Sequence, residues 1–356
     1  MLDILKGRDP APADKSSSEG LGQFRKPVIG LALGGGAARG FAHIGILRTL
    51  LKHGIVPDVI AGTSIGAVVG GCYAAGRLDE LEAWALGLQR RNILGYLDFR
   101  LNGTGLIGGS KLAQQLEASI GDIRIEDLPL KFATVATEIK TGHEIWLTHG
   151  RVVDAMRASY ALPGILASMR IGDRWLVDGA LVNPVPASVA RALGAEIVIA
   201  ANVSTDITGH GATIAGYGPP PAEEPEPVEE QPPQKMGLSR FFSSERAMKS
   251  PERAVKREFL GSSERPGISK TMVDAFNIMQ DRITRARLAG DPPDILISPR
   301  VTRTGWFDFH RAAETIAHGE RAAERAIESI EEAVQFLAPQ SPSPNGSMTN
   351  ATKKDE

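Results

Sequence analysis

Two consecutive segments, each made of an apolar run, a glycine-rich turn and a helical stretch, constrain the fold of this chain most. The first has an expected strand at 28–33, a turn at 34–36 and a helix at 38–52; the second has a strand at 58–61, a turn at 62–64 and a helix at 65–75. Both helical stretches are apolar almost all round, which predicts that they are buried. Such units build a parallel sheet covered by helices on both faces. The predicted fold class is α/β, a three-layer α/β/α domain.

Antiparallel pieces are expected to make the central sheet mixed, although mostly parallel. Two pairs of short strands are typical of hairpins: 132–137 with 144–148, and 169–171 with 174–177. Further elements are strands at 196–202 and 294–298, helices at 78–89, 110–120 and 185–193, and one long helix at 309–336. Met272, Phe276, Met279 and Ile283 recur at helical spacing and predict a core stripe.

Composition divides the chain into one interrupted domain and two tails. Residues 1–26 lack an apolar run of signal-peptide length and predict a disordered arm, and residues 339–356 predict a polar disordered tail. The domain at 27–338 is interrupted at 204–266 by a flexible insertion, rich in Pro and Glu and then basic at 238–260. This basic segment is either an interfacial amphipathic helix or lid, or a solvated loop. We expect any peripheral membrane contact to be made by it.

Charge and cysteine content exclude several partner classes. With 40 Lys plus Arg against 42 Asp plus Glu, no overall field attracts nucleic acid, so no nucleic-acid partner is expected. The single cysteine, Cys72, cannot form an intramolecular disulfide, which fits a reducing cytoplasmic location. Residues 59–76 carry no charge over 18 positions, but their five glycines favour a strand, a turn and a buried helix over a membrane span.

The segment Gly62-Thr63-Ser64-Ile65-Gly66 is a GxSxG motif that follows a predicted strand and precedes a predicted helix. At such a corner the serine adopts a strained conformation, and Gly62 and Gly66 let the neighbouring chains pass. The hydroxyl then stands at the carboxyl edge of the sheet, with a helix N-terminus behind it to favour developing negative charge. Ser64 is therefore a candidate nucleophile; the alternative is a structural turn serine.

A second glycine-rich loop, Gly34-Gly35-Gly36-Ala37-Ala38-Arg39-Gly40, allows two interpretations. A dinucleotide-binding turn would expect an acidic residue at the end of the next strand, but Asp58 lies at the beginning of that strand. Alternatively, the backbone N–H groups of Gly34, Gly35 and Gly36 form an oxyanion hole for the oxygen produced when Ser64 attacks an ester. Successive parallel strands end at the same sheet edge, so both loops can face one substrate.

A nucleophilic serine needs a base, and the seven histidines offer little. Only His310 weakly fits the order serine, acid, histidine that GxSxG hydrolases follow. Asp178 is the better candidate, because it ends an apolar strand and is followed by Gly179; a surface turn is the alternative. A free aspartate, with a pKa of about 3.9, is a weak base for a hydroxyl, but burial beside Ser64 would raise that pKa.

These motifs resemble the patatin-like phospholipases, and within them the bacterial branch related to neuropathy target esterase. The similarity covers 27–202 closely and 267–336 more loosely; it rests on the glycine-rich loop, the GxSxG motif, Ala158-Ser159-Tyr160-Ala161-Leu162-Pro163 and Asp178-Gly179-Ala180. The loop spacing before Arg39 is that of the bacterial branch, and Ala180 replaces a glycine that many members carry.

The resemblance implies a Ser64–Asp178 dyad without a catalytic histidine, an oxyanion hole at Gly34, Gly35 and Gly36, and an Arg39 that shapes this loop or meets a substrate phosphate. It implies hydrolysis of acyl esters of phospholipids or lysophospholipids, with no metal and no cofactor. An alternative from another class is a catalytically weak regulatory or membrane-adaptor protein on the same scaffold. A dinucleotide-binding oxidoreductase is a third.

Overall fold

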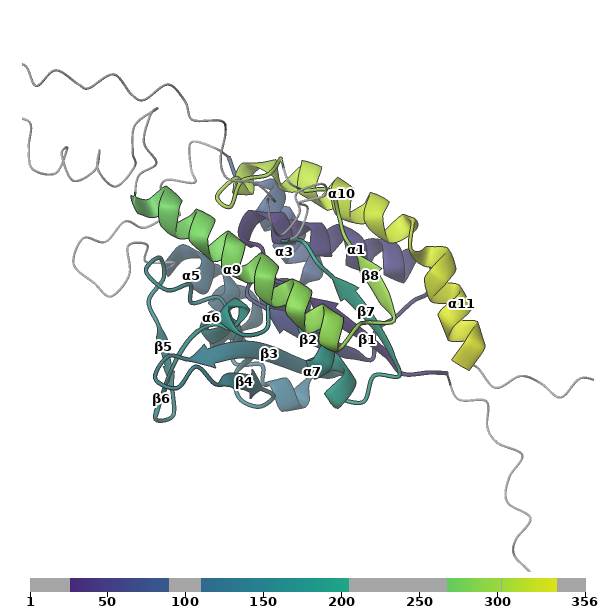
Figure 1. Ribbon diagram of the computed structural model, residues 1–356, viewed down its shortest axis with the longest axis horizontal. Helices are drawn as coiled ribbons and strands as arrows, with labels where there is room; N and C mark the ends of the chain where they lie inside the picture. Colours follow the sequence, from purple (N-terminus) through teal and green to yellow (C-terminus); the bar gives the residue numbers. More distant parts are fainter. Residues whose placement is uncertain (1–25, 90–109, 205–267, 302, 338–356) are drawn as a thin grey trace, which may run out of the picture.

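The structure is a computed structural model that describes residues 26–89, 110–204, 268–301 and 303–337, arranged as a sheet between helical layers (Figure 1). The sheet has the strand order β5-β6-β3-β2-β1-β7-β8, and β4 pairs with β3. The strands are β1 (Ile29–Leu33), β2 (Val59–Thr63), β3 (Lys131–Glu138), β4 (Glu144–Leu147), β5 (Met169–Ile171), β6 (Arg174–Asp178), β7 (Ile197–Ala201) and β8 (Ile295–Ile297).

The pairing confirms the predicted mixed, mostly parallel sheet. Strands β3, β2, β1, β7 and β8 run parallel to one another, and both expected hairpins, β3–β4 and β5–β6, are antiparallel. Strand β6 joins the two parts by pairing antiparallel to β3, with Asp178 opposite Ala136. This pairing brings the end of β6 to the edge of the sheet where β2 also ends.

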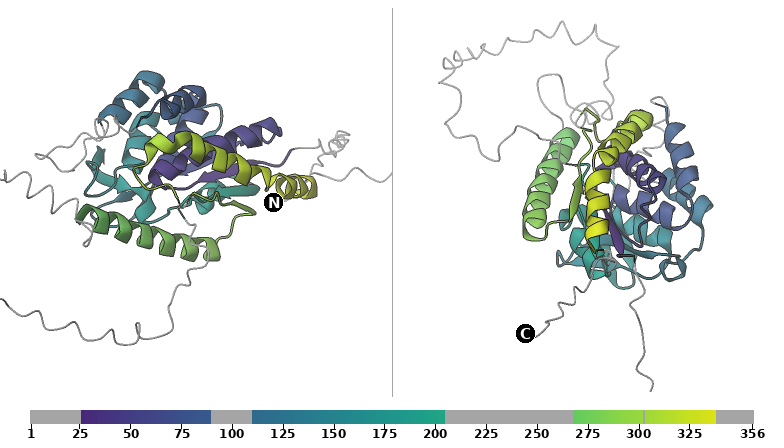
Figure 2. Two further views of the ribbon diagram at one scale, coloured as in Figure 1. Left: turned by 90° about the horizontal axis from the view of Figure 1, so that it is seen from above. Right: turned by 90° about the vertical axis from the view of Figure 1, so that its right-hand side faces the viewer.

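The side chains of alternate residues in the central strands pack into two hydrophobic cores, one on each face of the sheet. Leu31 and Leu33 face a large helical layer, whereas Ala32 faces a smaller one. The large layer contains α1 (Ala42–Lys52), α2 (Ile65–Ala74), α3 (Leu78–Leu86), α5 (Ser110–Ile120), α6 (Val152–Ser159), α10 (Ala312–Glu324) and α11 (Ile327–Leu337). On the other face lie α7 (Ala187–Ala192) and α9 (Ile268–Gly290) (Figure 2). The α/β/α layering is therefore the predicted one.

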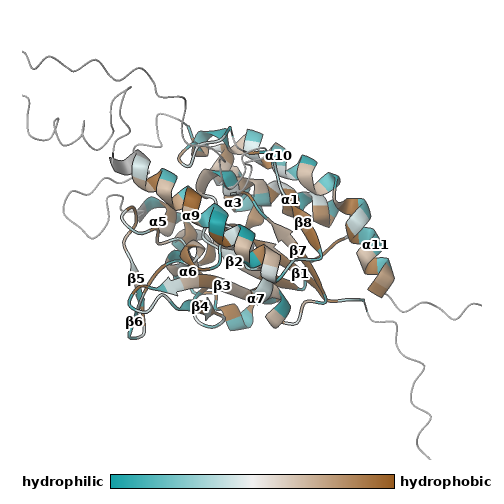
Figure 3. Ribbon diagram, viewed as in Figure 1, coloured by the Kyte–Doolittle hydropathy of each residue, from teal (hydrophilic) through white to brown (hydrophobic). Residues whose placement is uncertain are grey.

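Helix α9 buries a different face from the one that its apolar spacing predicts. Phe276 is buried, but Met272 and Met279 are 40% and 45% exposed, and the ribbon of α9 carries apolar as well as polar turns on its visible side (Figure 3). Gln280 and Thr284 are buried instead. The reason is that α9 packs on the short 3₁₀ helix η3 (Gly179–Leu181) and on Trp306, beside the loops at the end of the sheet.

The long helix expected at 309–336 is divided into a 3₁₀ turn, η5 (Phe309–Arg311), and the helices α10 and α11, with a break at 325–326. Helix α10 lies close to α1, since a Cβ added to Gly319 would meet the Ala42 carbonyl oxygen at 1.9 Å. The break changes the direction of the chain so that Ile327 and Ile330 of α11 still enter the core.

Several expectations fall outside the described residues: the arm before Lys26, the insertion after Ser204 including the basic segment 238–260, and the tail at 339–356. The uncharged stretch 59–76 forms β2 and α2, as its glycines suggest. In the ranges that the structure describes, no helix has both the length and the apolar character needed to span a bilayer.

Candidate active site

The turn between β2 and α2 holds Ser64 in the left-handed backbone region, with φ 56° and ψ −123°. Non-glycine residues rarely adopt a positive φ, and this strain accompanies a serine at a sharp strand-to-helix corner. The flanking glycines are sterically required. A Cβ on Gly66 would lie 2.1 Å from the Leu33 carbonyl oxygen, and one on Gly62 would lie 2.5 Å from Ala67 Cα. Residues 62–66 therefore form the sharp corner that the motif predicts.

The Ser64 hydroxyl donates a hydrogen bond to Asp178 at 2.6 Å, from Oγ to Oδ2. The second carboxyl oxygen of Asp178 accepts the Ala180 N–H at 2.8 Å, which fixes the orientation of the carboxyl group. Thr137 of the neighbouring strand β3 donates its hydroxyl proton to the Asp178 carbonyl at 2.9 Å. The structure thus brings together the candidate nucleophile and the candidate base, which are 114 positions apart in the sequence.

The environment of Asp178 suits it to exchange a proton near neutral pH. The side chain is almost fully buried, and burial raises its pKa from 3.8 to about 7, against the smaller lowering effect of the hydrogen bonds from Ser64 and Ala180. Burial acts in this direction because it disfavours the charged carboxylate. The ionised carboxylate is therefore a stronger base than a free aspartate.

The backbone of Ser64 is held by Ser159, a residue for which the sequence predicts no role. The Ser64 N–H donates to Ser159 Oγ at 2.9 Å, and the Ser159 hydroxyl donates in turn to the Val135 carbonyl at 2.6 Å. Ser159 is fully buried at the end of α6. Its motif was visible in the sequence, but this contact depends on how α6 packs on β3.

The glycine-rich loop differs from the expected oxyanion hole. The N–H groups of Gly34 and Gly35 already donate to the carbonyls of Ala201 and Pro184, at 3.0 and 2.9 Å. Among the described residues, the N–H of Gly36 has no acceptor, and Gly36 lines a cavity together with Ser64. Of the three amides expected as oxyanion donors, those of Gly34 and Gly35 hold the loop in place in this structure, which leaves Gly36 as the candidate.

Two further residues that line the same cavity begin helices. Ala37 and Ile65 are the first residues of η1 (Ala37–Phe41) and α2, where N–H groups have no intrahelical acceptor. Both line the cavity beside Ser64. The backbone N–H groups of Gly36, Ala37 and Ile65 are thus the candidates for binding an oxygen next to the serine.

The buried side chain of His43 holds the glycine-rich loop through the Gly34 carbonyl. The pKa of His43 falls from 6.5 to about 4, because burial disfavours the charged ring and outweighs the raising effect of its bond to the backbone. The ring is therefore neutral near pH 7, and Nε2 contacts the Gly34 carbonyl oxygen at 2.7 Å, which assigns the proton to Nε2. None of the histidines in the described ranges hydrogen-bonds to Ser64 or Asp178.

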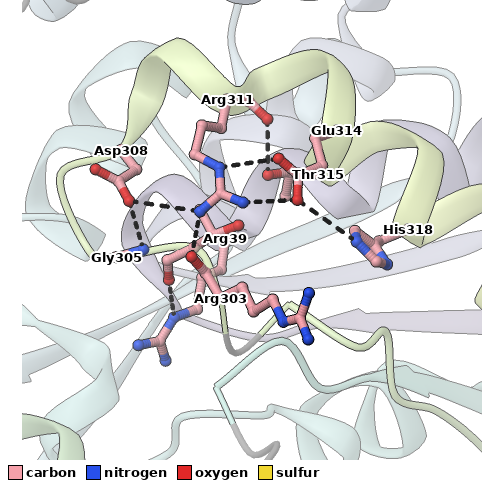
Figure 4. Close-up of polar contacts among 9 residues, drawn as sticks. Arg39, Arg303, Gly305, Asp308, Arg311, Glu314, Thr315 and His318 are labelled. Carbon is pink, nitrogen blue, oxygen red and sulfur yellow. Dashed lines mark hydrogen bonds and ion pairs between the residues drawn. The ribbon is translucent and has the colours of Figure 1, made fainter.

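Arg39 contacts the backbone of distant segments and does not line the cavity. Its Nε donates to the Thr304 carbonyl at 3.0 Å, and Nη1 approaches the Ser204 carbonyl at 3.5 Å. In Figure 4, Arg311 lies above this contact and connects Glu314 of α10 to Asp308 and to the Arg303 carbonyl. Of the two roles expected for Arg39, these contacts match the shaping of the loop.

A cavity of about 150 Å³ opens beside the two candidate catalytic residues. Its walls are mainly apolar and come from both halves of the chain: Ile65, Val68, Trp84, Leu88, Leu112, Leu162, Ile165, Leu166, Trp306, Phe307 and Phe309. Such a lining can hold an apolar chain end next to the serine hydroxyl. In the part of the chain that the structure describes, no cluster of three or more His, Cys, Asp or Glu could bind a metal ion.

Comparison with known proteins defines the class to which this fold and site belong. A family model described as "Patatin-like phospholipase" matches residues 31–191, which include Ser64 and Asp178. An "Uncharacterized NTE family protein" of Mycobacterium tuberculosis is 33% identical over 347 residues, covering 86% of this chain and 92% of that protein. The chain therefore belongs to the patatin-like phospholipase family and is similar to its NTE members, as its motifs predict.

Two further matches cover less or agree less well. "Patatin-like phospholipase domain-containing protein 7" of Mus musculus is 34% identical over 201 residues, which are 53% of this chain and 15% of that protein. The solved structure of VipD from Legionella pneumophila matches with a TM-score of 0.39 and 11% identity, over 85% of this chain and 67% of VipD. Family membership supports a lipid hydrolase activity in general.

Proposed function

We propose that this chain is a serine acyl hydrolase that removes ester-linked fatty acyl chains from phospholipids or lysophospholipids. The observation that carries the proposal is the 2.6 Å hydrogen bond from Ser64 to the buried Asp178, at the wall of an apolar cavity. A strained serine, a carboxyl group with raised pKa and a mainly apolar pocket together suit attack on an acyl ester. The cavity would hold the end of the acyl chain nearest the ester.

In the acylation step, ionised Asp178 takes the Ser64 proton while Oγ bonds to the ester carbonyl carbon. The carbonyl electron pair moves to oxygen, which the N–H groups of Gly36, Ala37 and Ile65 would stabilise by about 3–4 kcal/mol per well-placed donor. The tetrahedral intermediate collapses, the alcohol leaves with the proton held on Asp178, and an acyl-Ser64 ester remains. Asp178 then takes a proton from water as the water oxygen bonds to the acyl carbon. The second tetrahedral intermediate collapses, Ser64 Oγ leaves with the proton held on Asp178, and the fatty acid is released.

Product analysis after incubation with a mixed lipid extract tests this function. The purified protein should release free fatty acids and lysolipids, or glycerophosphodiesters from lysolipids, detected by mass spectrometry. Ser64→Ala and Asp178→Asn should reduce release at least about 10³-fold, since both act in the chemical step. Because Asp178 must be ionised, kcat/KM should rise with pH and level off above about 7.

The controls separate an enzyme from a scaffold without turnover. A fluorophosphonate probe should label wild type and fail on Ser64→Ala. Unchanged hydrolysis by the two variants would refute the proposed dyad, and absence of both labelling and hydrolysis in wild type would favour the regulatory or membrane-adaptor alternative.

We also propose a cytoplasmic location with peripheral contact at the inner membrane face through residues 238–260. Its basic residues would meet anionic lipid headgroups, each contributing about 1 kcal/mol near the surface. Binding to anionic and neutral liposomes, with and without this segment, measures the contribution. Equal liposome binding by the full-length protein and by a variant that lacks residues 238–260 would refute the membrane role of this segment.

A further inference from the structure

Helix α9 presents a buried polar side chain to the candidate active site. Gln280 is 2% exposed and lines the same cavity as Ser64 and Asp178. It lies one helical turn after Phe276, whose ring packs edge-to-face on Trp306 at 5.4 Å. The region matched by the family model ends at 191, so Gln280 reaches the site from outside that region.

The position of the carboxamide is defined relative to the glycine-rich loop. A Cβ added to Gly35 would lie 3.5 Å from Gln280 Nε2 and 3.4 Å from Ser64 Cβ. The amide nitrogen and the nucleophile therefore border the same small space. A side chain on Gly35 would fill that space, and the glycine leaves it open.

The carboxamide of Gln280 has no hydrogen-bond partner among the described residues, and its Oε1 is fully buried. Leaving a buried polar group unpaired costs about 1–3 kcal/mol. A leucine or methionine at this position would bury no polar group and would avoid that cost. Packing alone therefore does not explain an amide here, whereas a substrate oxygen bound beside Ser64 would give the Nε2 donor, which lies toward Ser64, an acceptor.

We propose that Gln280 Nε2 donates a hydrogen bond to the carbonyl oxygen of the scissile ester and to the oxyanion that this oxygen becomes. The inference rests on the proposed acyl hydrolase function. As Ser64 Oγ bonds to the carbonyl carbon, the π electron pair moves to oxygen, and Gln280 stabilises the charge without transferring a proton. Gln280 is thereby a catalytic residue that joins the backbone amides of Gly36, Ala37 and Ile65.

The test is steady-state hydrolysis of a short-chain nitrophenyl ester by the full-length protein and its Gln280→Met variant. Methionine keeps the length of the side chain and removes both polar atoms. Because the donor acts mainly on the transition state, kcat should fall about 10- to 100-fold while KM stays within about threefold. The melting temperature should be equal or higher, since an unpaired buried amide has been removed.

The matched control is Thr284→Val, one turn further along α9. Thr284 is 1% exposed and also lacks a hydrogen-bond partner for its hydroxyl, but it does not line the cavity. It should retain wild-type kcat and KM. If Gln280→Met does not fold, Gln280→Glu preserves the shape and places an acceptor where a donor is needed, so its kcat at about pH 8 should fall at least as far.

The outcomes separate this inference from the proposed function. Activity that Ser64→Ala removes and Gln280→Met retains within about twofold would leave the hydrolase standing and overturn the role of Gln280. An increase in KM with unchanged kcat, or an equal loss in Thr284→Val, would overturn it as well. Wild-type protein without Ser64-dependent hydrolysis would overturn both.

Discussion

Asp178→Asn should abolish hydrolysis and at the same time stabilise the folded protein above neutral pH. The variant keeps the local hydrogen bonds, because an Asn side chain can accept the Ala180 N–H with its oxygen and face Ser64 Oγ with its amide. What it removes is the buried negative charge. Loss of activity and gain of stability are thus expected from the same atom.

The magnitude follows from the raised pKa of this carboxyl group. The pKa rises from 3.8 in the unfolded chain to about 7 in the native state, where burial is the largest cause. Between these two values the unfolded chain has released the proton and the native state retains it, so wild type loses stability as pH rises through this window. A shift of about three pKa units corresponds to about 4 kcal/mol, an upper value that is reached above about pH 7.

Urea unfolding of wild type and Asp178→Asn at about pH 4.5 and about pH 8 measures this effect. The stabilisation by the substitution should be small at the lower pH and approach 4 kcal/mol, within about a factor of two, at the higher pH. Asp173→Asn is the matched control, because its carboxyl group lies on the same hairpin but is exposed; it should change stability at neither pH. A gain that is equal at both pH values, or a loss at both, would refute the desolvation argument.

Three further substitutions examine the supports of the site. Ser159→Ala removes the acceptor of the Ser64 N–H, so it should cost about 1–3 kcal/mol in urea unfolding and lower kcat more than it changes KM. Gly66→Ala should give little folded protein in a solubility and thermal-melt assay, because its Cβ would collide with the Leu33 carbonyl oxygen. The control Gly290→Ala has open space around its Cβ and should melt like wild type. The side chain of His43→Gln can still donate to the Gly34 carbonyl but does not titrate. Wild type should lose stability as pH falls from about 6.5 to about 4, because the unfolded chain binds a proton that the native His43 ring does not. A variant whose unfolding free energy falls equally steeply over this pH range would contradict this assignment.

Local sequence carried enough information to predict the serine corner and the layered sheet. Gly62, Ser64 and Gly66 lie within five positions, and their geometry is set by one turn between a strand and a helix, so the pattern and the steric requirement coincide. The position of Asp178 can also be predicted from the sequence, because an apolar strand that ends in a carboxylate and a glycine predicts a strand end at the sheet edge. Their 2.6 Å separation required the structure.

The expectations that changed depend on contacts between distant segments. Gly34 and Gly35 use their amides on Ala201 and Pro184, more than 140 positions later, and nothing within the loop indicates those acceptors. The buried face of α9 differs from the predicted one because apolar periodicity assumes that a helix packs on an apolar core. Gln280 instead lines the cavity beside Ser64 and Asp178, so the burial of this polar side chain runs against the pattern.

The origin of the pocket walls has an evolutionary consequence. Ser64, Asp178 and the amides near them all lie before position 192, within the stretch that the family model recognises, whereas Gln280, Trp306 and Phe309 come from the last quarter of the chain. Under the proposed function, changes at Trp306 and Phe309 would alter which acyl groups fit while leaving Ser64 and Asp178 in place. Divergence among relatives in substrate choice can therefore arise in the C-terminal quarter as well as among the wall residues before position 192, and a search for the catalytic motifs alone would pass over that late part of the gene.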